Sequence, residues 1–240
     1  MFDDFFDEKH TEESHILEMI NNPQTGLARN SHEHLFITCY LKALEQQTSD
    51  AIRHTCNKVF EAQTLSTKQV QSDLPVQDLL HITRKKGGIS LLFYRAGLSG
   101  LMDSREKELL LKIGFLGQLE NDIFDVYKDY QAGIHTLATR ATSMVDLRAR
   151  FQDILKEVYA LIEKTDFPRK NKKGFSRLIA VIAGRGLVCL DQLARLEGAG
   201  SFDISAYTRN QLICDMGKAR NIIKWLGYYL SWDKNISTRA

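Results

Sequence analysis

The sequence predicts an all-α fold, a bundle of long helices. Its long segments are rich in Leu, Ala, Ile, Glu, Lys and Gln, and their apolar residues recur near the 3.6-residue helical period. The only three prolines, Pro23, Pro75 and Pro168, each lie where a helical pattern pauses. Alternating β-branched runs bounded by turns, the pattern typical of strands, do not occur. Helices this long and this apolar must pack against one another, so we expect a bundle.

The pauses divide the chain into its expected helices. One helix precedes Pro23, two lie between Pro23 and Pro75, three lie between Pro75 and Pro168, and two follow. The segment KNKKG at 170–174 is expected to be a basic surface loop. The expected helices cover about 2–21, 30–47, 50–71, 77–99, 104–131, 144–165, 174–197 and 203–231.

Length and composition limit the classes of protein to consider. With 240 residues, 43% of them hydrophobic, the chain can bury a sizeable core, and we expect a single domain over 1–240. A net charge of +2 argues against an extended nucleic-acid surface. The acidic start does not resemble a signal peptide, and no apolar run approaches the ~20 residues of a membrane span. We therefore expect a soluble, cytoplasmic protein.

Cysteine spacing gives no sign of a metal site. No pair of cysteines has CxxC spacing, and no cysteine and histidine set has zinc spacing. Buried free thiols in a reducing cytoplasm are the expectation. The four cysteines are Cys39, Cys56, Cys189 and Cys214.

An acidic motif, DDFFDE, opens the chain. Asp3 and Asp7 are four residues apart, so a helix would place both carboxylates on one face. Like charges at this spacing destabilise a helix, and Mg²⁺, which prefers carboxylate oxygens, would offset the repulsion. The alternative is a solvated acidic helix start, which the helix dipole favours.

A second polar stripe lies in the segment LENDIFDVYKD. Asn121, Asp125 and Asp129 are spaced i, i+4 and i+8 on a helix whose preceding residues are apolar on most sides. Buried carboxylates need compensation, which a metal-filled cavity would supply, whereas a solvent-facing stripe would need none. Two such stripes on separate helices suit a clamp in which several metal ions bind a diphosphate. Aromatic residues available to line a dry pocket, or simply to fill the core, are Phe5, Phe6, Phe93, Tyr94, Phe115 and Phe124.

A basic segment, DLLHITRKKGG, precedes the second motif. The cations Arg84, Lys85 and Lys86 stand before a Gly-Gly pair, which suggests a kinked helix whose freed backbone faces a phosphate. A solvated basic turn is the alternative. Near the C-terminus, Arg220 and Lys224 are one turn apart and could contact a diphosphate, although ordinary helix packing also explains this region.

These motifs resemble those of class I isoprenoid (terpenoid) synthases. DDFFDE looks like the aspartate-rich DDxxD(E) motif, and NDIFDVYKD resembles the second motif of terpene cyclases, NDxxSxxxE, including the Lys that precedes its last acid, Lys128. It departs from that motif at Asp125 and Asp129. These departures, together with Gln118 and GIHTL at 133–137, resemble the chain-elongating trans-prenyl diphosphate synthases.

The resemblance implies an all-α bundle of the terpenoid synthase type and a role for each motif. Asp3 and Asp7 would hold two Mg²⁺ ions, and Asn121, Asp125 and Asp129 a third. Arg84, by the cyclase pattern, or Lys85 or Lys86, by the elongating pattern, would sense the diphosphate of a prenyl diphosphate substrate. The residues expected to contact this substrate are Gln118, Lys128, Arg220 and Phe93.

Three functions remain open. The first is ionisation of an allylic prenyl diphosphate followed by cyclisation, the second is chain elongation by a prenyltransferase, and the third is a non-catalytic helical bundle that retains the acidic stripes. In the family the first motif follows several helices, whereas here it begins at Asp3. We therefore expect a fragment, a wall supplied by another subunit or impaired activity. A bundle that lacks one wall would expose apolar surface, which suggests self-association as a homodimer.

Overall fold

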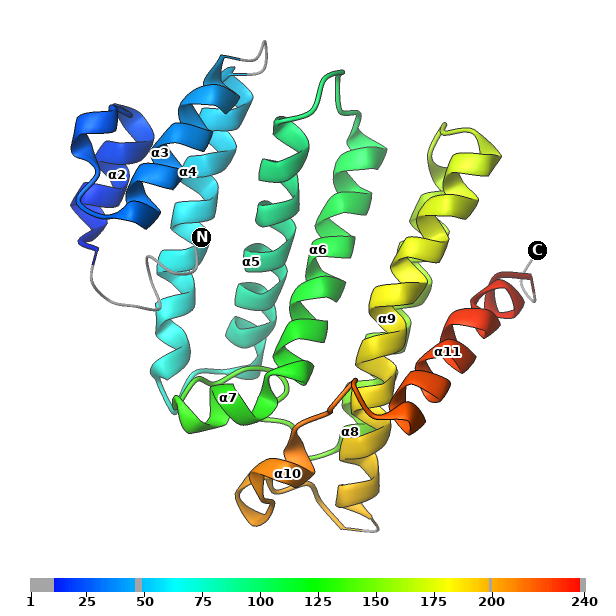
Figure 1. Cartoon of the computed structure of the whole chain (residues 1–240). Coiled ribbons are helices and arrows are strands. Elements are labelled where there is room, and N and C mark those ends of the chain that lie inside the picture. Colours follow the sequence, from blue (N-terminus) through cyan, green and yellow to red (C-terminus); the bar gives the residue numbers. More distant parts are fainter. Residues whose placement is uncertain (1–10, 46–48, 199, 238–240) are drawn as a thin grey trace.

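The computed structural model describes residues 11–45, 49–198 and 200–237, with side chains described up to Trp232. Every regular element in these residues is helical, which confirms the all-α prediction (Figure 1). The α-helices are α2 (Glu13–Asn21), α3 (Ser31–Leu44), α4 (Ser49–Ser66), α5 (Val76–Ala96), α6 (Ser104–Phe124), α7 (Val126–Gln131), α8 (Met144–Lys164), α9 (Arg169–Glu197), α10 (Arg209–Leu212) and α11 (Ala219–Ser237). Short 3-10 turns are η1 (Thr25–Leu27), η2 (Thr67–Val70) and η3 (Ile204–Ala206).

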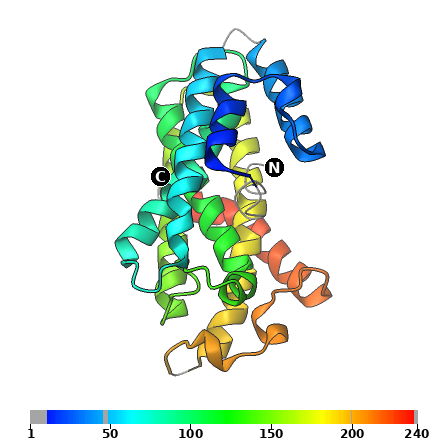
Figure 2. The same ribbon diagram turned by 90° about the vertical axis from the view of Figure 1, so that its left-hand side faces the viewer.

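Helices α4, α5, α6, α8 and α9 form the body of the bundle (Figure 1). The main hydrophobic core lies between α5, α6, α8 and α9, with Leu119, Ile123, Phe151 and Leu190 fully buried. A second cluster joins α2, α3 and α4. Figure 2 shows α2 and α3 at one end of the molecule and α10 at the other.

The tightest helix contact is the crossing of α5 and α6. A Cβ atom on Gly87 would lie 2.0 Å from the Gly114 carbonyl oxygen, and one on Gly114 would lie 2.2 Å from the Gly87 carbonyl oxygen. Only glycine fits such a backbone contact. The expectation of a kink at Gly87-Gly88 is therefore wrong, because α5 continues through both residues and they are buried against α6.

Three helix boundaries differ from the sequence expectation. The helix expected over 104–131 is interrupted at Asp125, between α6 and α7. The expected loop at 170–174 is helical, since α9 begins directly after Pro168, and proline is favoured at the start of a helix. The helix expected over 203–231 is instead η3, α10, a turn and α11, because the Asp215 carboxylate accepts a hydrogen bond from the Gly217 backbone and favours a turn there.

The cysteines are free thiols, as expected, but the expectation that they are buried is wrong for Cys39. Cys39 on α3 is exposed, whereas Cys56 on α4, Cys189 on α9 and Cys214 before α11 are buried. The Cys189 thiol donates to the Ile123 carbonyl at 3.4 Å. No helix among the described residues has the length and apolarity needed to cross a membrane.

Candidate functional site

An acidic residue outside the predicted ligand set, Asp122, is buried at the end of α6. The Gln118 amide donates to Asp122 Oδ1 at 2.9 Å, and the Thr83 hydroxyl of α5 lies 3.5 Å from Oδ2. Burial raises the pKa of Asp122 to about 6, although the Gln118 hydrogen bond and the charge of Lys86 oppose this shift. Asp122 is therefore a carboxylate for which the folded protein provides incomplete compensation.

Asp125 and Asp129 follow Asp122 on nearly continuous helical backbone. The Asp125 amide donates to the Asn121 carbonyl at 2.8 Å, and the Asp129 amide donates to the Asp125 carbonyl at 2.9 Å, so the i, i+4, i+8 register survives the interruption at Asp125. Burial, followed by repulsion from Asp122 and Asp125, raises the pKa of Asp129 to about 7. Because the charges of Asp122 and Asp125 both act on Asp129, the three carboxylates lie near one another. We call Asp122, Asp125 and Asp129 the acidic group.

The sequence prediction and the structure emphasise different residues of this motif. Asn121 is exposed, and Asp125 and Asp129 are half-buried. Asp122 was not predicted as a site residue, although it shares a helix face with the buried Leu119 and Val126 at three- and four-residue spacing. This apolar spacing was the signal that could have identified Asp122 as an inward-facing acid.

The three cations of the basic segment point in different directions. Lys86 is partly buried, and its charge lowers the pKa values of both Asp122 and Asp129, so it lies near the acidic group. The Arg84 guanidinium lies over the Phe115 ring, 5.1 Å from its centroid, and Lys85 is exposed. Of these three residues, the structure brings Lys86 to the acidic group.

A second buried acid, Glu120, connects α6 to α9. Arg185 donates from Nε to Glu120 Oε1 at 2.6 Å and from Nη2 to Oε2 at 2.5 Å. The guanidinium also lies 4.6 Å from the centroid of the Phe124 ring, and the negative charge of Asp125 helps to raise its pKa. Sequence reasoning missed this pair, because Glu120 and Arg185 are 65 residues apart and no local pattern links them. The pair holds α9 against the end of α6 that carries the acidic group.

The remaining predicted contacts are dispersed. Phe93 lies two turns further along α5 than Lys86 and packs against the second hydrophobic cluster. Lys128 is exposed on α7, but its charge reaches Asp129. Arg220 is exposed on α11. The first acidic motif, with Asp3 and Asp7, lies outside the described residues.

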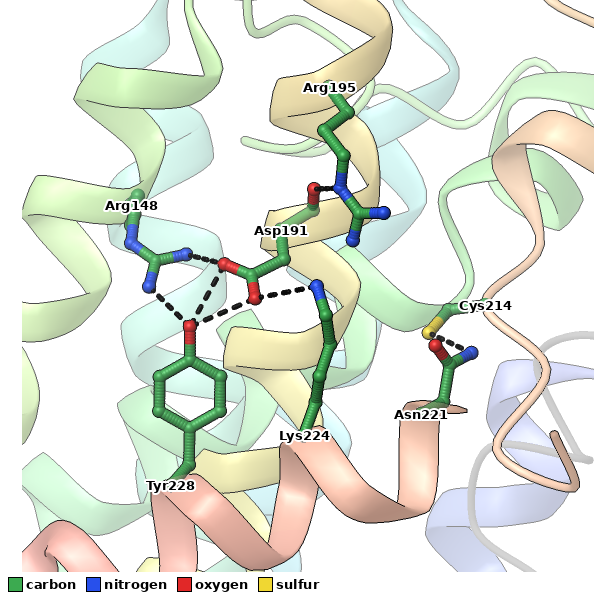
Figure 3. A network of polar contacts seen from close by, with 7 residues as sticks. All are labelled: Arg148, Asp191, Arg195, Cys214, Asn221, Lys224 and Tyr228. Atoms are coloured by element: carbon green, nitrogen blue, oxygen red, sulfur yellow. Dashed lines mark hydrogen bonds and ion pairs between the residues drawn. The ribbon is translucent and has the colours of Figure 1, made fainter. Parts of the chain in front are cut away.

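A separate polar network holds α11 in place (Figure 3). Asp191 of α9 accepts hydrogen bonds from Arg148 of α8 at 2.6 Å and from Lys224 of α11 at 3.2 Å. The Tyr228 hydroxyl lies 2.9 Å from Asp191 Oδ1 and accepts from Arg148 at 2.8 Å. Burial alone would raise the pKa of Asp191, but these three partners lower it. Lys224, a candidate for diphosphate contact, is thus engaged in joining α11 to α9.

The acidic group has the chemistry that a hard divalent cation requires. Carboxylate oxygens are the preferred ligands of Mg²⁺, and a cation would relieve the repulsion that raises the pKa of Asp129. The residue types present are therefore ones that Mg²⁺ prefers. The described part of the chain contains no group of three His, Cys, Asp or Glu side chains arranged to hold a metal ion by themselves. A complete site would need further ligands, from substrate phosphate, from water or from residues outside the described ranges.

A pocket of about 400 Å³ lies near the start of α5, apart from the acidic group. It is lined by residues of α4, η2 and α5, among them Lys68, Asp78 and His81. None of the predicted site residues lines it. We therefore assign the candidate site to the acidic group and Lys86.

Comparison with known proteins adds no relative. No family model, no curated protein and no solved structure matches this chain. The functional argument therefore depends on the residues of the chain itself.

Proposed function

We propose that this protein is a magnesium-dependent class I isoprenoid synthase that ionises an allylic prenyl diphosphate at the acidic group. The observation that carries the proposal is the placement of the buried Asp122 and the half-buried Asp125 and Asp129 on nearly continuous helical backbone, close enough for the charge of Lys86 to lower the pKa values of Asp122 and Asp129. Such a group attracts cations and, through them, phosphate. The resemblance of DDFFDE and NDIFDVYKD to the two metal motifs of this family supports the same reaction.

Each residue has a distinct role in the proposal. Asn121, Asp125 and Asp129 would hold Mg²⁺ together with Asp3 and Asp7 of the first motif. When bound, Mg²⁺ would neutralise the diphosphate leaving group as the C–O bond breaks. Lys86 would bind a diphosphate oxygen, since its ammonium already lies near the carboxylates.

Buried hydrogen bonds keep the participating helices in register. Gln118 orients Asp122, and Arg185 fixes α9 against the end of α6 by binding Glu120. Orientation by buried partners is what keeps a constellation of this kind within reacting geometry. Gln118 and Arg185 are therefore positioning residues in this proposal.

The fate of the allylic cation distinguishes two versions of the proposal. Cyclisation is the first version, because Asn121, Asp122 and Lys128 follow the cyclase motif. Chain elongation is the second version, because Asp125 stands where cyclases have Ser or Thr. A cyclase releases diphosphate and forms a cyclic hydrocarbon or alcohol, whereas an elongating enzyme forms a longer diphosphate.

The test is incubation of the full chain with allylic diphosphates of increasing length, with and without isopentenyl diphosphate, in Mg²⁺. Released diphosphate is measured enzymatically and the products are identified by mass spectrometry. Lys86→Met is expected to slow diphosphate release roughly 100-fold, comparable to the loss of one charge-stabilising group. The controls Lys85→Met and Arg84→Met remove neighbouring cations of α5 and should leave the rate within a few-fold of the parent.

A second readout does not depend on turnover. Mg²⁺ that binds only the folded protein raises the unfolding temperature, and Asp125→Asn with Asp129→Asn should abolish this rise. The control Asp153→Asn removes an exposed carboxylate of α8 and should preserve it. If no substrate releases diphosphate and Mg²⁺ does not change the unfolding temperature, a non-catalytic bundle is favoured over the proposal.

A further inference from the structure

The outward face of α11 is apolar. Trp225 and Tyr228 point toward α9, where the Trp225 indole donates to the Val181 carbonyl at 2.9 Å and Tyr228 meets Asp191. The opposite side of α11 exposes Ile222, Ile223, Leu226 and Leu230, and Leu230 is 69% exposed. Neighbouring α9 exposes three more aliphatic side chains, Leu178, Val181 and Ile182. We call these seven residues the aliphatic patch.

The spacing of the patch on α11 differs from that of an ordinary solvent-facing surface. Leu226 lies three and four residues after Ile223 and Ile222 and four before Leu230, so the four side chains form one continuous stripe along the helix. The outer stripe of a surface helix is normally polar. An aliphatic stripe in that place marks a surface that meets another apolar phase.

The two helix segments that carry the patch are basic and contain no acidic residue. From Arg169 to Leu190 of α9, and from Ala219 to Trp232 of α11, the sequence contains no Asp or Glu. The remaining residues of the chain carry more acidic than basic groups, so the net positive charge of the chain comes from these two segments. The basic residues of the two segments are Arg169, Lys170, Lys172, Lys173, Arg177, Arg185, Arg220 and Lys224.

Several of these cations are exposed on α9 and α11. Arg169, Lys170, Arg177 and Arg220 are exposed. The Arg177 guanidinium lies 6.0 Å from the ring centroid of Trp232, so the basic beginning of α9 adjoins the end of the stripe on α11. Arg185 pairs with Glu120 and Lys224 pairs with Asp191, so these two cations join helices within the bundle.

We propose that the α9–α11 face docks the protein on the surface of an anionic phospholipid bilayer. The aliphatic patch would enter the boundary between head groups and acyl chains, while the flanking Lys and Arg side chains contact lipid phosphates. Docking of this kind requires no membrane-spanning helix. A second copy of the chain suits the face less well, because a two-fold contact would bring the same two basic segments, 169–190 and 219–232, together.

The test is sedimentation of the full chain with vesicles of phosphatidylcholine alone and of phosphatidylcholine mixed with phosphatidylglycerol. The protein is expected to bind the mixed vesicles, to bind neutral vesicles far less, and to dissociate as the salt concentration rises. Equal binding to both kinds of vesicle, or binding to neither, would overturn the proposal.

Matched variants assign the binding to this face. Leu226→Gln with Leu230→Gln should abolish sedimentation, whereas Leu98→Gln with Leu101→Gln, at exposed leucines between α5 and α6, should not. Arg169→Gln with Lys170→Gln should weaken binding roughly 30-fold, about five-fold for each cation removed. The control Lys107→Gln with Lys68→Gln removes exposed cations elsewhere and should have little effect. Patch variants that bind as the controls do contradict the proposal.

Sedimentation without vesicles tests whether a second copy of the chain covers the aliphatic patch instead of a bilayer. The proposal expects a monomer whose mass does not change when Leu226 and Leu230 are replaced. A dimer that dissociates in the Leu226→Gln, Leu230→Gln variant would mean that a second copy covers the patch, and would replace the lipid proposal.

Discussion

Asp122 is an acidic residue buried at the end of α6. Its carboxylate is 4% exposed, yet its strongest hydrogen bond comes from a neutral amide, that of Gln118. The sequence identified the neighbouring Asn121, Asp125 and Asp129 by their spacing. It did not identify Asp122, because the direction of a side chain near a helix end depends on which face α5 covers. That packing is a tertiary property.

The pKa of Asp122 sets the direction of a pH effect on stability. Its folded value of about 6 lies above the usual 3.8, so the folded protein binds this proton more tightly than the unfolded chain. Asp122 therefore contributes most to stability below pH 4, and this contribution is lost as the pH rises through 6. In chelator, Asp122→Asn is expected to raise the free energy of unfolding at pH 7 by about 1–2 kcal/mol.

Urea unfolding of the parent and Asp122→Asn proteins at pH 4.5 and pH 7 checks this expectation. These two pH values lie about one pH unit or more below and above the pKa of Asp122 in the folded protein. The difference between the two proteins should grow from the lower pH to the higher. A difference that is the same at both values would show that Asp122 ionises normally.

Glu120 and Arg185 provide the opposite case, a buried charge with a complete partner. Arg185→Met leaves the Glu120 carboxylate unpaired at 2% exposure and is expected to lower the free energy of unfolding by about 3 kcal/mol. The double variant Glu120→Leu, Arg185→Leu should recover most of the loss, because no buried charge remains. Denaturant titration gives the free energy of unfolding of the parent, of Arg185→Met and of the double variant. A double variant as unstable as Arg185→Met would contradict this account.

At the scale of the element, the sequence predicted helices better than it predicted their contacts. The periodicity located α3, α4, α5 and α8 to within a few residues, since these helices have continuous apolar faces. The Gly87-Gly88 pair was interpreted as a kink because glycine weakens helices. Its actual role, the close approach of α5 to Gly114, depends on a residue of another helix.

The α5–α6 crossing gives a matched pair of substitutions within α6. Gly114→Ala places a Cβ 2.2 Å from the Gly87 carbonyl oxygen and is expected to destabilise the protein by about 3 kcal/mol or more, because backbone must move. Gly117→Ala, one turn later, meets nothing within 4 Å and should stabilise by about 0.5–1 kcal/mol through helix propensity. Thermal unfolding followed by circular dichroism distinguishes them, and similar shifts for both would refute the tight crossing.

At the scale of the whole molecule, two hydrophobic clusters of unequal size share the chain. The main cluster lies within α5, α6, α8 and α9, and the second joins α2 and α3 to α4. The sequence predicted a single domain and could not divide its core, since both clusters arise from similar helical patterns. Which helices share a cluster is decided by long-range packing.

The smaller cluster is expected to open first. Fewer buried side chains hold α2 and α3 than hold α5 and α6, so local opening there requires less free energy. Hydrogen exchange followed by mass spectrometry should show faster exchange in peptides from 13–44 than in peptides from 76–124. Equal protection of both regions would mean that the two clusters unfold as one unit.

The four thiols are buried to different extents, so their reactivity can be used to follow this local opening. Cys39 is exposed and can be alkylated in the native protein, while burial raises the pKa of Cys56 to about 12 and suppresses its reaction. Cys56 becomes reactive when the smaller cluster opens, and Cys189 when α9 separates from α6. The order in which a thiol reagent modifies Cys39, Cys56 and Cys189 therefore reports the order in which the helices separate, and no substitution or added label is needed.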